Sequence, residues 1–276
     1  MDLWQAAVLG VVEGLTEFLP VSSTGHLTIV ERLMGMKTDS ASLTAFTAVI
    51  QVGAILAAVL YFRTDIVRIV VGWVRGLFRP AHRGDFDYKF GWYVILGSIP
   101  IGVAGVVGKS LIESVLRSLW FVVAGLLLWS VVIWLAEKYA SQRRTELDVG
   151  WRDALFVGVA QVIALVPGVS RSGATISAGL VRGLDRVTAT RLSFFLGIPA
   201  LAAAGVYELK DAVATGGIGW LPTLVGTVVS FLVAYAAVAW FLRFVTKHSL
   251  TTFIWYRVPL GILLAVLLLT GTIDAT

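Results

Sequence analysis

Four ionisable residues lie in or beside two apolar stretches of this 276-residue sequence: Glu13, Glu17, His26 and Arg171. Taking an ionised group out of water is costly unless a partner or a bound ion offsets the cost. An ionisable residue inside an apolar segment is therefore a candidate functional residue. A salt-bridge cluster that only joins the two stretches is the structural alternative. Hydroxyl residues surround both stretches, and they favour a functional site over that alternative.

The two glutamates are four residues apart, so a helix would place both carboxylates on one face. Two like charges in an apolar setting repel each other unless one is protonated or a cation lies between them. Carboxylate oxygens suit a hard divalent ion, and Mg²⁺ typically takes one or two of them together with substrate phosphates. Glu13 and Glu17 are therefore candidate metal ligands.

Each apolar stretch ends near a proline, Pro20 or Pro167, which cannot continue a helix, and the serines that follow are good N-caps. Two helix N-termini would then direct unpaired N–H groups into one volume, which favours an anion there. Arg171 adds a planar cationic fork that suits phosphate oxygens. The candidate ligands of a substrate diphosphate are Ser22, Ser23, Thr24, Ser170, Arg171, Ser172 and Thr175.

His26 follows Ser23 by three residues, so an imidazole and a hydroxyl share one face of the expected second helix. This arrangement allows a general base to activate a serine nucleophile or a water molecule. With Glu17 and Arg171, these two residues form the expected catalytic group. Together the residue types indicate metal-assisted phosphoryl chemistry.

The elements that position these residues are those of an integral membrane protein. Of all residues, 58% are hydrophobic and 14% are charged, whereas roughly a quarter of the residues of a soluble domain are charged. Six apolar runs have the roughly 17 to 25 residues that cross a bilayer. They lie near residues 44–62, 90–108, 118–136, 188–207, 220–242 and 257–273. The absence of cysteine excludes disulfides, thiolate metal sites and a cysteine nucleophile.

Two further stretches, near 3–35 and 153–183, predict pairs of half-length helices, which fit re-entrant hairpins better than full spans. GVVEGLTEFLPVSSTG aligns with GVAQVIALVPGVSRSG at a constant offset of 148 residues, which indicates an internal repeat. Each half, roughly 1–138 and 150–276, has one hairpin and three spans, and an odd number of spans makes the repeats inverted. We expect one all-α polytopic membrane domain, 1–276, with six transmembrane helices, two re-entrant helical hairpins in an inverted-topology repeat, and polar tips that meet near the midplane.

The basic residues predict the orientation. Assigned to the connections between segments, sixteen of the 22 Lys and Arg fall on one side and five on the other, with Arg171 left over. The positive-inside rule then predicts both termini on the outer side of the membrane. This count places Arg257 among the inner charges. The net charge of +5 is therefore assigned to membrane orientation and not to nucleic acid binding.

EGLTEFLPVSSTGH (13–26) and PGVSRSGAT (167–175) resemble the two signature motifs of the undecaprenyl-diphosphatase family, also called the bacitracin-resistance (BacA/UppP) family. The resemblance implies hydrolysis of undecaprenyl diphosphate to undecaprenyl phosphate and phosphate, which recycles the lipid carrier of peptidoglycan synthesis. It also implies a divalent cation, Mg²⁺ or Ca²⁺, and a site reached from the outer face of a bacterial inner membrane. The functional positions that it implies are Glu13, Glu17, Ser22, Ser23, His26, Arg171 and Thr175. The motifs do not decide whether Ser23, His26 or a water molecule is the nucleophile.

Another class of protein shares the expected architecture. Inverted repeats with broken helices that meet at the midplane are typical of secondary transporters, so a carrier of phosphate or lipid phosphate is the alternative, and a lipid-phosphate-binding scaffold is a third. The repeat aligns Glu13 with Gln161 and Ser23 with Arg171. Unlike tips favour a hydrolase, because its two halves need distinct roles. The expected partners are undecaprenyl diphosphate and membrane lipid, without nucleic acid; self-association and flipping of the product stay open.

Overall fold

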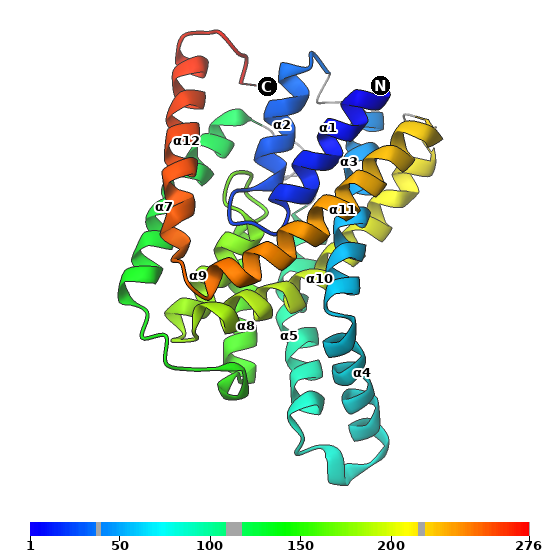
Figure 1. The fold of residues 1–276 in the computed structure, drawn as a ribbon, viewed down its shortest axis with the longest axis vertical. Helices are drawn as coiled ribbons and strands as arrows, with labels where there is room; N and C mark the ends of the chain where they lie inside the picture. Colours follow the sequence, from blue (N-terminus) through cyan, green and yellow to red (C-terminus); the bar gives the residue numbers. More distant parts are fainter. Residues whose placement is uncertain (37–39, 109–117, 215–218, 276) are drawn as a thin grey trace.

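The computed structural model describes residues 1–36, 40–108, 118–214 and 219–275. Apart from one isolated β-bridge, between Arg144 and Leu184, the regular structure of these residues is helical (Figure 1). The longer helices are α3 (Ala41–Tyr61), α5 (Phe86–Val107), α7 (Leu119–Tyr139), α10 (Arg186–Ala214), α11 (Trp220–Val245) and α12 (Ile254–Leu269). The shorter helices are α1 (Leu3–Thr16), α2 (Ser23–Leu33), α4 (Arg63–Phe78), α8 (Trp151–Ile163) and α9 (Arg171–Val181). Short 3₁₀ helices lie between them at η1 (Pro80–His82), η3 (Glu146–Asp148) and η4 (Leu250–Phe253).

Six helical segments of the described chain are long and apolar enough to cross a bilayer, as predicted. They are Ser42–Tyr61, Phe86–Val107, Leu119–Tyr139, Arg186–Val206, Trp220–Val245 and Leu250–Leu269. The chain is therefore a multi-pass membrane protein. The last of these segments begins seven residues before the predicted start at 257, because η4 leads directly into α12. Tyr256 and Arg257 consequently lie inside the last span and not in the loop before it.

Two pairs of short helices, α1 with α2 and α8 with α9, occupy the stretches predicted to contain half-length helices. They contain 14, 11, 13 and 11 residues. At about 1.5 Å per residue, none of them reaches across a hydrocarbon core of about 30 Å. The predicted breaks are confirmed, since α1 ends before Pro20 and α8 ends before Pro167.

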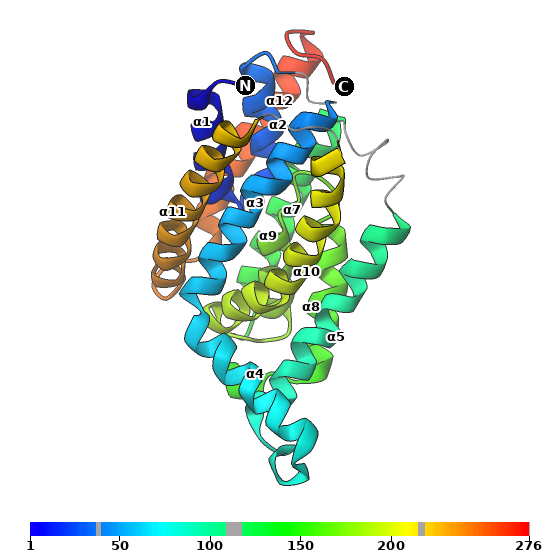
Figure 2. The ribbon, with the colours of Figure 1, turned by 90° about the vertical axis from the view of Figure 1, so that its right-hand side faces the viewer.

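The helices form an elongated bundle, and both chain ends lie at the same end of it (Figures 1 and 2). Within the bundle, α1 packs along α11 and α8 packs along α5. Glycines permit both contacts. A Cβ on Gly10 would lie 2.5 Å from the carbonyl oxygen of Gly226, and one on Gly158 would lie 2.8 Å from the carbonyl carbon of Gly97. Small residues of this kind allow apolar helices to approach closely without an aqueous driving force.

At the opposite end of the bundle, α4 and the first turns of α5 project beyond the other helices (Figure 1). Arg68 of α4 pairs with Asp87 of α5 at 2.7 Å, which ties the two helices together. The outward side of α4 exposes Val67, Val70 and Val74, which follow one another at helical spacing.

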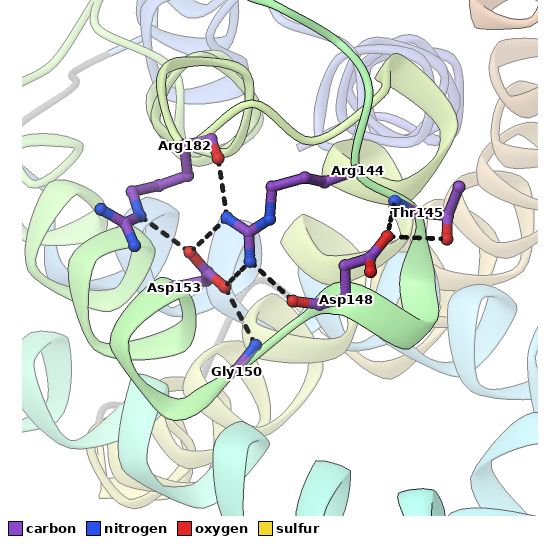
Figure 3. A network of polar contacts seen from close by, with 6 residues as sticks. All are labelled: Arg144, Thr145, Asp148, Gly150, Asp153 and Arg182. Carbon is purple, nitrogen blue, oxygen red and sulfur yellow. Dashed lines mark hydrogen bonds and ion pairs between the residues drawn. The ribbon is translucent and has the colours of Figure 1, made fainter.

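A polar network joins the segment before α8 to the end of α9 (Figure 3). Asp153 is 2% exposed and receives Arg144 Nη2 at 2.6 Å and Arg182 Nε at 2.7 Å. Arg144 also donates to the carbonyl oxygens of Asp148 and Arg182. The network therefore fixes the start of α8 and the end of α9 relative to each other.

An aromatic core lies beside the turn that follows α1. Phe18 is fully buried, and its ring meets the ring of Phe194 edge-on at 5.3 Å. Phe62 and Phe241 pack on Phe194 with ring centroids 5.7 and 6.2 Å away. Because Phe18 follows Glu17 directly, this packing fixes the backbone that carries the Glu17 carboxylate.

Candidate active site

The turns that follow α1 and α8 contact each other through two serines. Ser22 Oγ accepts a hydrogen bond from the backbone N–H of Gly168 at 3.1 Å. Ser170 Oγ donates to the carbonyl oxygen of Leu19 at 3.3 Å. Each serine thus bonds to the backbone of the opposite turn, so the two turns meet as predicted, and their place near the membrane midplane stays a prediction.

The same two serines begin the second helix of each pair. Ser22 caps α2 and accepts from the N–H of Gly25 at 3.4 Å, and Ser170 caps α9 and accepts from the N–H of Gly173 at 3.2 Å. Their φ angles are 78° and 76°. Residues with a Cβ rarely adopt positive φ, at a cost of about 1–3 kcal/mol, and such strain clusters at functional sites. The caps were predicted from the sequence, but the strained backbone was not.

Three predicted site residues come together at the junction of these turns. Ser23 donates its hydroxyl hydrogen to Glu17 Oε2 at 2.7 Å. Arg171 Nη2 lies 3.4 Å from Glu17 Oε1, and the two side chains are 9% and 3% exposed. Arg171, at the start of α9, therefore faces the same carboxylate that accepts the hydroxyl hydrogen of Ser23, at the start of α2.

Helix α10 contacts the Arg171 side chain and holds it in place. Its Nη1 donates to the carbonyl oxygen of Ser193 at 3.2 Å. One turn further along α10, a Cβ on Gly197 would lie 2.6 Å from the guanidinium carbon. The guanidinium also lies 5.8 Å from the ring centroid of Phe18. The lack of a side chain at Gly197 therefore leaves the space that the Arg171 guanidinium occupies.

Three predicted phosphate ligands lie elsewhere in the same region. The Thr175 hydroxyl is fully buried, donates to the carbonyl oxygen of Arg171 at 2.8 Å and lies 2.6 Å from Ser193 Oγ. The Ser172 hydroxyl is also buried, 3.1 Å from Ser170 Oγ. Thr24, in contrast, is exposed. Thr175 and Ser172 therefore support the turn from its protein side, and direct contact of these three residues with a phosphate stays a prediction.

Glu13 lies one helical turn before Glu17 and is 1% exposed. Within the described chain, its Oε1 has no hydrogen-bond partner. A buried carboxylate oxygen without a partner is costly unless something else binds it. Across the described residues, no group of three or more His, Asp or Glu side chains is placed to enclose a metal ion. Glu13 and Glu17 are thus the carboxylates that could share a cation with a substrate.

His26 and Ser23 share one face of α2, but each bonds to a different partner. His26 Nδ1 lies 2.7 Å from the carbonyl oxygen of Ser22, and Nε2 lies 2.6 Å from the hydroxyl oxygen of Tyr256. A carbonyl oxygen only accepts, so Nδ1 carries the hydrogen, and Nε2 of the neutral ring accepts from the tyrosine. In this arrangement the general base nearest to the Ser23 hydroxyl is Glu17.

Arg257 was assigned to the inner-side charges, and this assignment was wrong. The residue lies inside α12, is 0% exposed, and donates to the carbonyl oxygens of Pro20 and Gly168, each at 2.9 Å. Fifteen inner-side basic residues remain against five, so the predicted orientation does not depend on Arg257. A sequence signal did exist, because the arginine stands directly before an apolar run. Ser193, Gly197 and Tyr256 were likewise not recognised as neighbours of the site.

Comparison with known proteins agrees with the motifs at this junction. The family model described as "Bacitracin resistance protein BacA" matches residues 6–263. The chain belongs to this family.

Its relatives in the BacA family align with it from end to end. It is 62% identical to an undecaprenyl-diphosphatase of Acidothermus cellulolyticus, over 98% of both chains. It is 56% identical to undecaprenyl-diphosphatase 3 of Frankia casuarinae, and 55% identical to an undecaprenyl-diphosphatase of Cutibacterium acnes, in each case over 100% of both chains. The BacA match includes both turns and every predicted site residue, from Glu13 to Thr175.

Proposed function

We propose that this BacA-family protein is a membrane-embedded lipid diphosphatase that hydrolyses undecaprenyl diphosphate to undecaprenyl phosphate and inorganic phosphate. Three relatives that are 55–62% identical to it, and that align with it over 98–100% of both chains, are named undecaprenyl-diphosphatases. The product would return the lipid carrier to peptidoglycan synthesis. The observation that carries the proposal is the partly buried junction of Glu17 with Ser23, at the start of α2, and Arg171, at the start of α9.

In the proposed reaction, Ser23 is the nucleophile and Glu17 is its base. The Ser23 hydroxyl already donates to Glu17 Oε2 at 2.7 Å, a distance suited to proton transfer. As the Ser23 oxygen bonds to the terminal phosphorus, its proton passes to Glu17, the bond from that phosphorus to the bridging oxygen breaks, and undecaprenyl phosphate leaves. Water then attacks the phosphorus, the Ser23 oxygen leaves and recovers the proton from Glu17, and the phosphate departs as dihydrogen phosphate, which keeps both hydrogens of the water.

Arg171 binds and stabilises the transferring phosphoryl group in this scheme. Its Nε is buried and has no hydrogen-bond partner among the residues that the structure describes, so this N–H is available to a phosphate oxygen. The N-termini of α2 and α9 add backbone N–H groups on either side. A fixed donor that faces developing negative charge contributes roughly 3 kcal/mol to transition-state stabilisation.

Glu13 and Glu17 are the residues that would hold a divalent cation, Mg²⁺ or Ca²⁺. The unpartnered, buried Oε1 of Glu13 fits such an ion, while both oxygens of Glu17 already face Ser23 and Arg171. Glu13 therefore has an oxygen atom that no other described residue binds. Glu17 lies on the same face, closer to the proposed position of the phosphate. A bound cation would screen the charge of the diphosphate and polarise its phosphoryl oxygens.

The arrangement in the membrane that we propose is the inverted repeat, with α1–α2 and α8–α9 as re-entrant hairpins entering from opposite faces. Two features support it. The aligned glycines Gly10 and Gly158 pack on Gly226 of α11 and Gly97 of α5, and the aligned serines Ser22 and Ser170 have φ angles within two degrees of each other. The shared end of the two chain termini and the excess of inner basic residues support an outer location for both termini. The site would then open to the outer face of the inner membrane.

Phosphate release by the purified protein tests this function. Reconstituted with undecaprenyl diphosphate and Mg²⁺ or Ca²⁺, the protein should release inorganic phosphate, and Arg171→Ala should lower turnover at least about 100-fold. Arg243→Ala, at the exposed end of α11, is the matched control and should leave turnover unchanged. Proteoliposomes that move phosphate or lipid phosphate without consuming diphosphate would instead support the carrier, and stoichiometric binding without turnover would support the scaffold.

A further inference from the structure

Arg257 joins the two turns of the site to α7 through one buried guanidinium. Nη1 donates to the carbonyl oxygen of Pro20, in the first turn, at 2.9 Å. Nη2 donates to the carbonyl oxygens of Gly168, in the second turn, at 2.9 Å and of Gly125, in α7, at 3.0 Å. Nε donates to Ser130 Oγ at 3.2 Å. A single side chain thus bonds to the backbone of both turns.

Backbone carbonyl groups and the Ser130 hydroxyl compensate the charge of Arg257. Within the described chain, Arg257 forms no ion pair with a carboxylate, and it is 0% exposed. A buried cation of this kind is expensive unless its geometry and hydrogen bonds are good, and a hydrophobic residue of similar volume is often at least as stable. Arg257 is therefore better explained by what it positions than by the stability that it adds.

The second turn fits closely around this contact. A Cβ on Gly125 would lie 2.6 Å from the carbonyl carbon of Gly168, and Gly168 itself has a φ of +89°. The backbone of the turn therefore lies directly against α7, with the guanidinium bonded to both. A small displacement of Arg257 would move the segment that leads into Ser170 and Arg171.

Tyr256, the residue before Arg257, holds the imidazole of the site. Its hydroxyl lies 2.6 Å from His26 Nε2, and its ring stacks on the imidazole with centroids 5.5 Å apart and planes 17° apart. Nδ1 is bonded to the carbonyl oxygen of Ser22, so the tyrosine meets the nitrogen that bears the lone pair. Adjacent residues of the last span therefore bond to the two turns and to the imidazole.

We infer that Tyr256 and Arg257 of α12 are positioning residues of the site: Arg257 holds the two turns in register, and Tyr256 fixes the tautomer and orientation of His26. The inference rests on the proposed diphosphatase function for its kinetic consequences, but the positions themselves can be tested without turnover. It makes the last span, which carries no part of either motif, an integral part of the site.

Tyr256→Phe tests the tyrosine, because it keeps the stacked ring and removes only the hydroxyl. We expect the ¹⁵N resonance of His26 Nε2 to move in histidine-labelled protein, assigned by comparison with His26→Gln. We expect kcat to fall roughly tenfold, the equivalent of about one hydrogen bond, with KM nearly unchanged. The pH at which the His26 ¹⁵N resonances titrate should move to higher values, since a donor to Nε2 stabilises the neutral ring. Tyr139→Phe, an exposed tyrosine, should change none of these.

Arg257 is tested by the series Arg257→Lys and Arg257→Met, which lowers the number of donors while keeping the length of the side chain. We expect kcat to be lower in Arg257→Lys than in the wild type and lower again in Arg257→Met. This order should hold even if the unfolding temperatures of the variants do not follow it. The control is Arg243→Lys.

The outcomes separate the two proposals. Unchanged ¹⁵N resonances and an unchanged ¹⁵N titration of His26 in Tyr256→Phe would overturn the role of the tyrosine. An Arg257→Met protein that folds and keeps wild-type kcat would overturn the role of the arginine. Wild-type protein without turnover would overturn the proposed function alone, and the ¹⁵N spectra would still decide whether Tyr256 holds His26.

Discussion

Ser23 donates its hydroxyl hydrogen to Glu17 Oε2 at 2.7 Å, across the turn that joins α1 to α2. The other carboxylate oxygen faces Arg171 at 3.4 Å. One carboxylate therefore links a candidate nucleophile at the start of α2 to a cation at the start of α9. Because the two contacts use different oxygens, Glu17 can accept the serine proton while it still faces the guanidinium.

Glu17→Gln should abolish most of the turnover. The amide keeps the size of the side chain but is a far weaker base than the carboxylate, so we expect kcat to fall by a factor on the order of 10² to 10⁴. Ser23→Ala should have a similar effect. The double variant should be little worse than either single one, because residues that act as a unit are strongly non-additive. Phosphate release measured on folded, monodisperse protein checks this.

The contrary result is simple to recognise. If the effects of Glu17→Gln and Ser23→Ala multiplied, the two residues would act in separate steps. Retention of wild-type kcat by Ser23→Ala would make His26 or a water molecule the nucleophile.

Gly197→Ala should disable Arg171 without touching either turn. The added methyl group would lie 2.6 Å from the guanidinium carbon, so the guanidinium must leave the position from which it pairs with Glu17. We expect kcat/KM to fall about 100-fold, the scale on which loss of one transition-state donor acts. Gly102→Ala in α5 is the matched control, since a Cβ there meets nothing within 4 Å. Equal kinetics in the two variants would refute this position for Arg171.

The sequence predicts the six spans well because its apolar runs have the length that a bilayer requires. The short helices could also be predicted, since Pro20 and Pro167 interrupt apolar runs that would otherwise continue. Both N-caps follow from serines two and three residues after these prolines. Each of these inferences uses local chemistry, which a short window of sequence contains.

The supporting residues could not be predicted in this way. Ser193 and Gly197 lie about twenty residues beyond the second motif, and only the packing of α10 against α9 brings them to Arg171. Arg257 was assigned to a loop because a charge at the edge of an apolar run is usually solvated. Tyr256 carries no local signal, since its contact with His26 joins residues 230 positions apart.

Removal of divalent cations should stop turnover, and Glu13 should set the affinity for them. Chelation should abolish phosphate release, and added Mg²⁺ or Ca²⁺ should restore it. In Glu13→Gln, the cation concentration that gives half of the maximal rate should rise at least about tenfold, since even residues behind a metal ligand change affinity by 10–100-fold. Glu146→Gln, in a partly exposed ion pair with Arg191, is the control. Full activity in the chelator would contradict a role for any cation.

Asp153→Asn should destabilise the protein, because it leaves Arg144 and Arg182 without the carboxylate that joins them (Figure 3). We expect a loss of about 2 kcal/mol, since a hydrogen bond to a charged group contributes about 1.5–3 kcal/mol and both arginines are partly solvated. Asp85→Asn, in an exposed pair with His82, should cost much less. Thermal unfolding of the detergent-solubilised protein measures both variants.

We also expect the stability that Asp153 contributes to depend on pH. Asp153 lies outside the six spans; burial by itself raises its pKa, but the hydrogen bonds from Arg144 and Arg182 outweigh burial and hold the pKa below the ordinary value of 3.8. A carboxyl group whose pKa is lower in the folded state contributes stability above the unfolded pKa and loses it as the pH falls through the folded pKa. The difference in unfolding temperature between wild type and Asp153→Asn should therefore be constant near neutral pH and shrink below about pH 4. A difference that grew on acidification would show that Asp153 is not held as an anion by the two arginines.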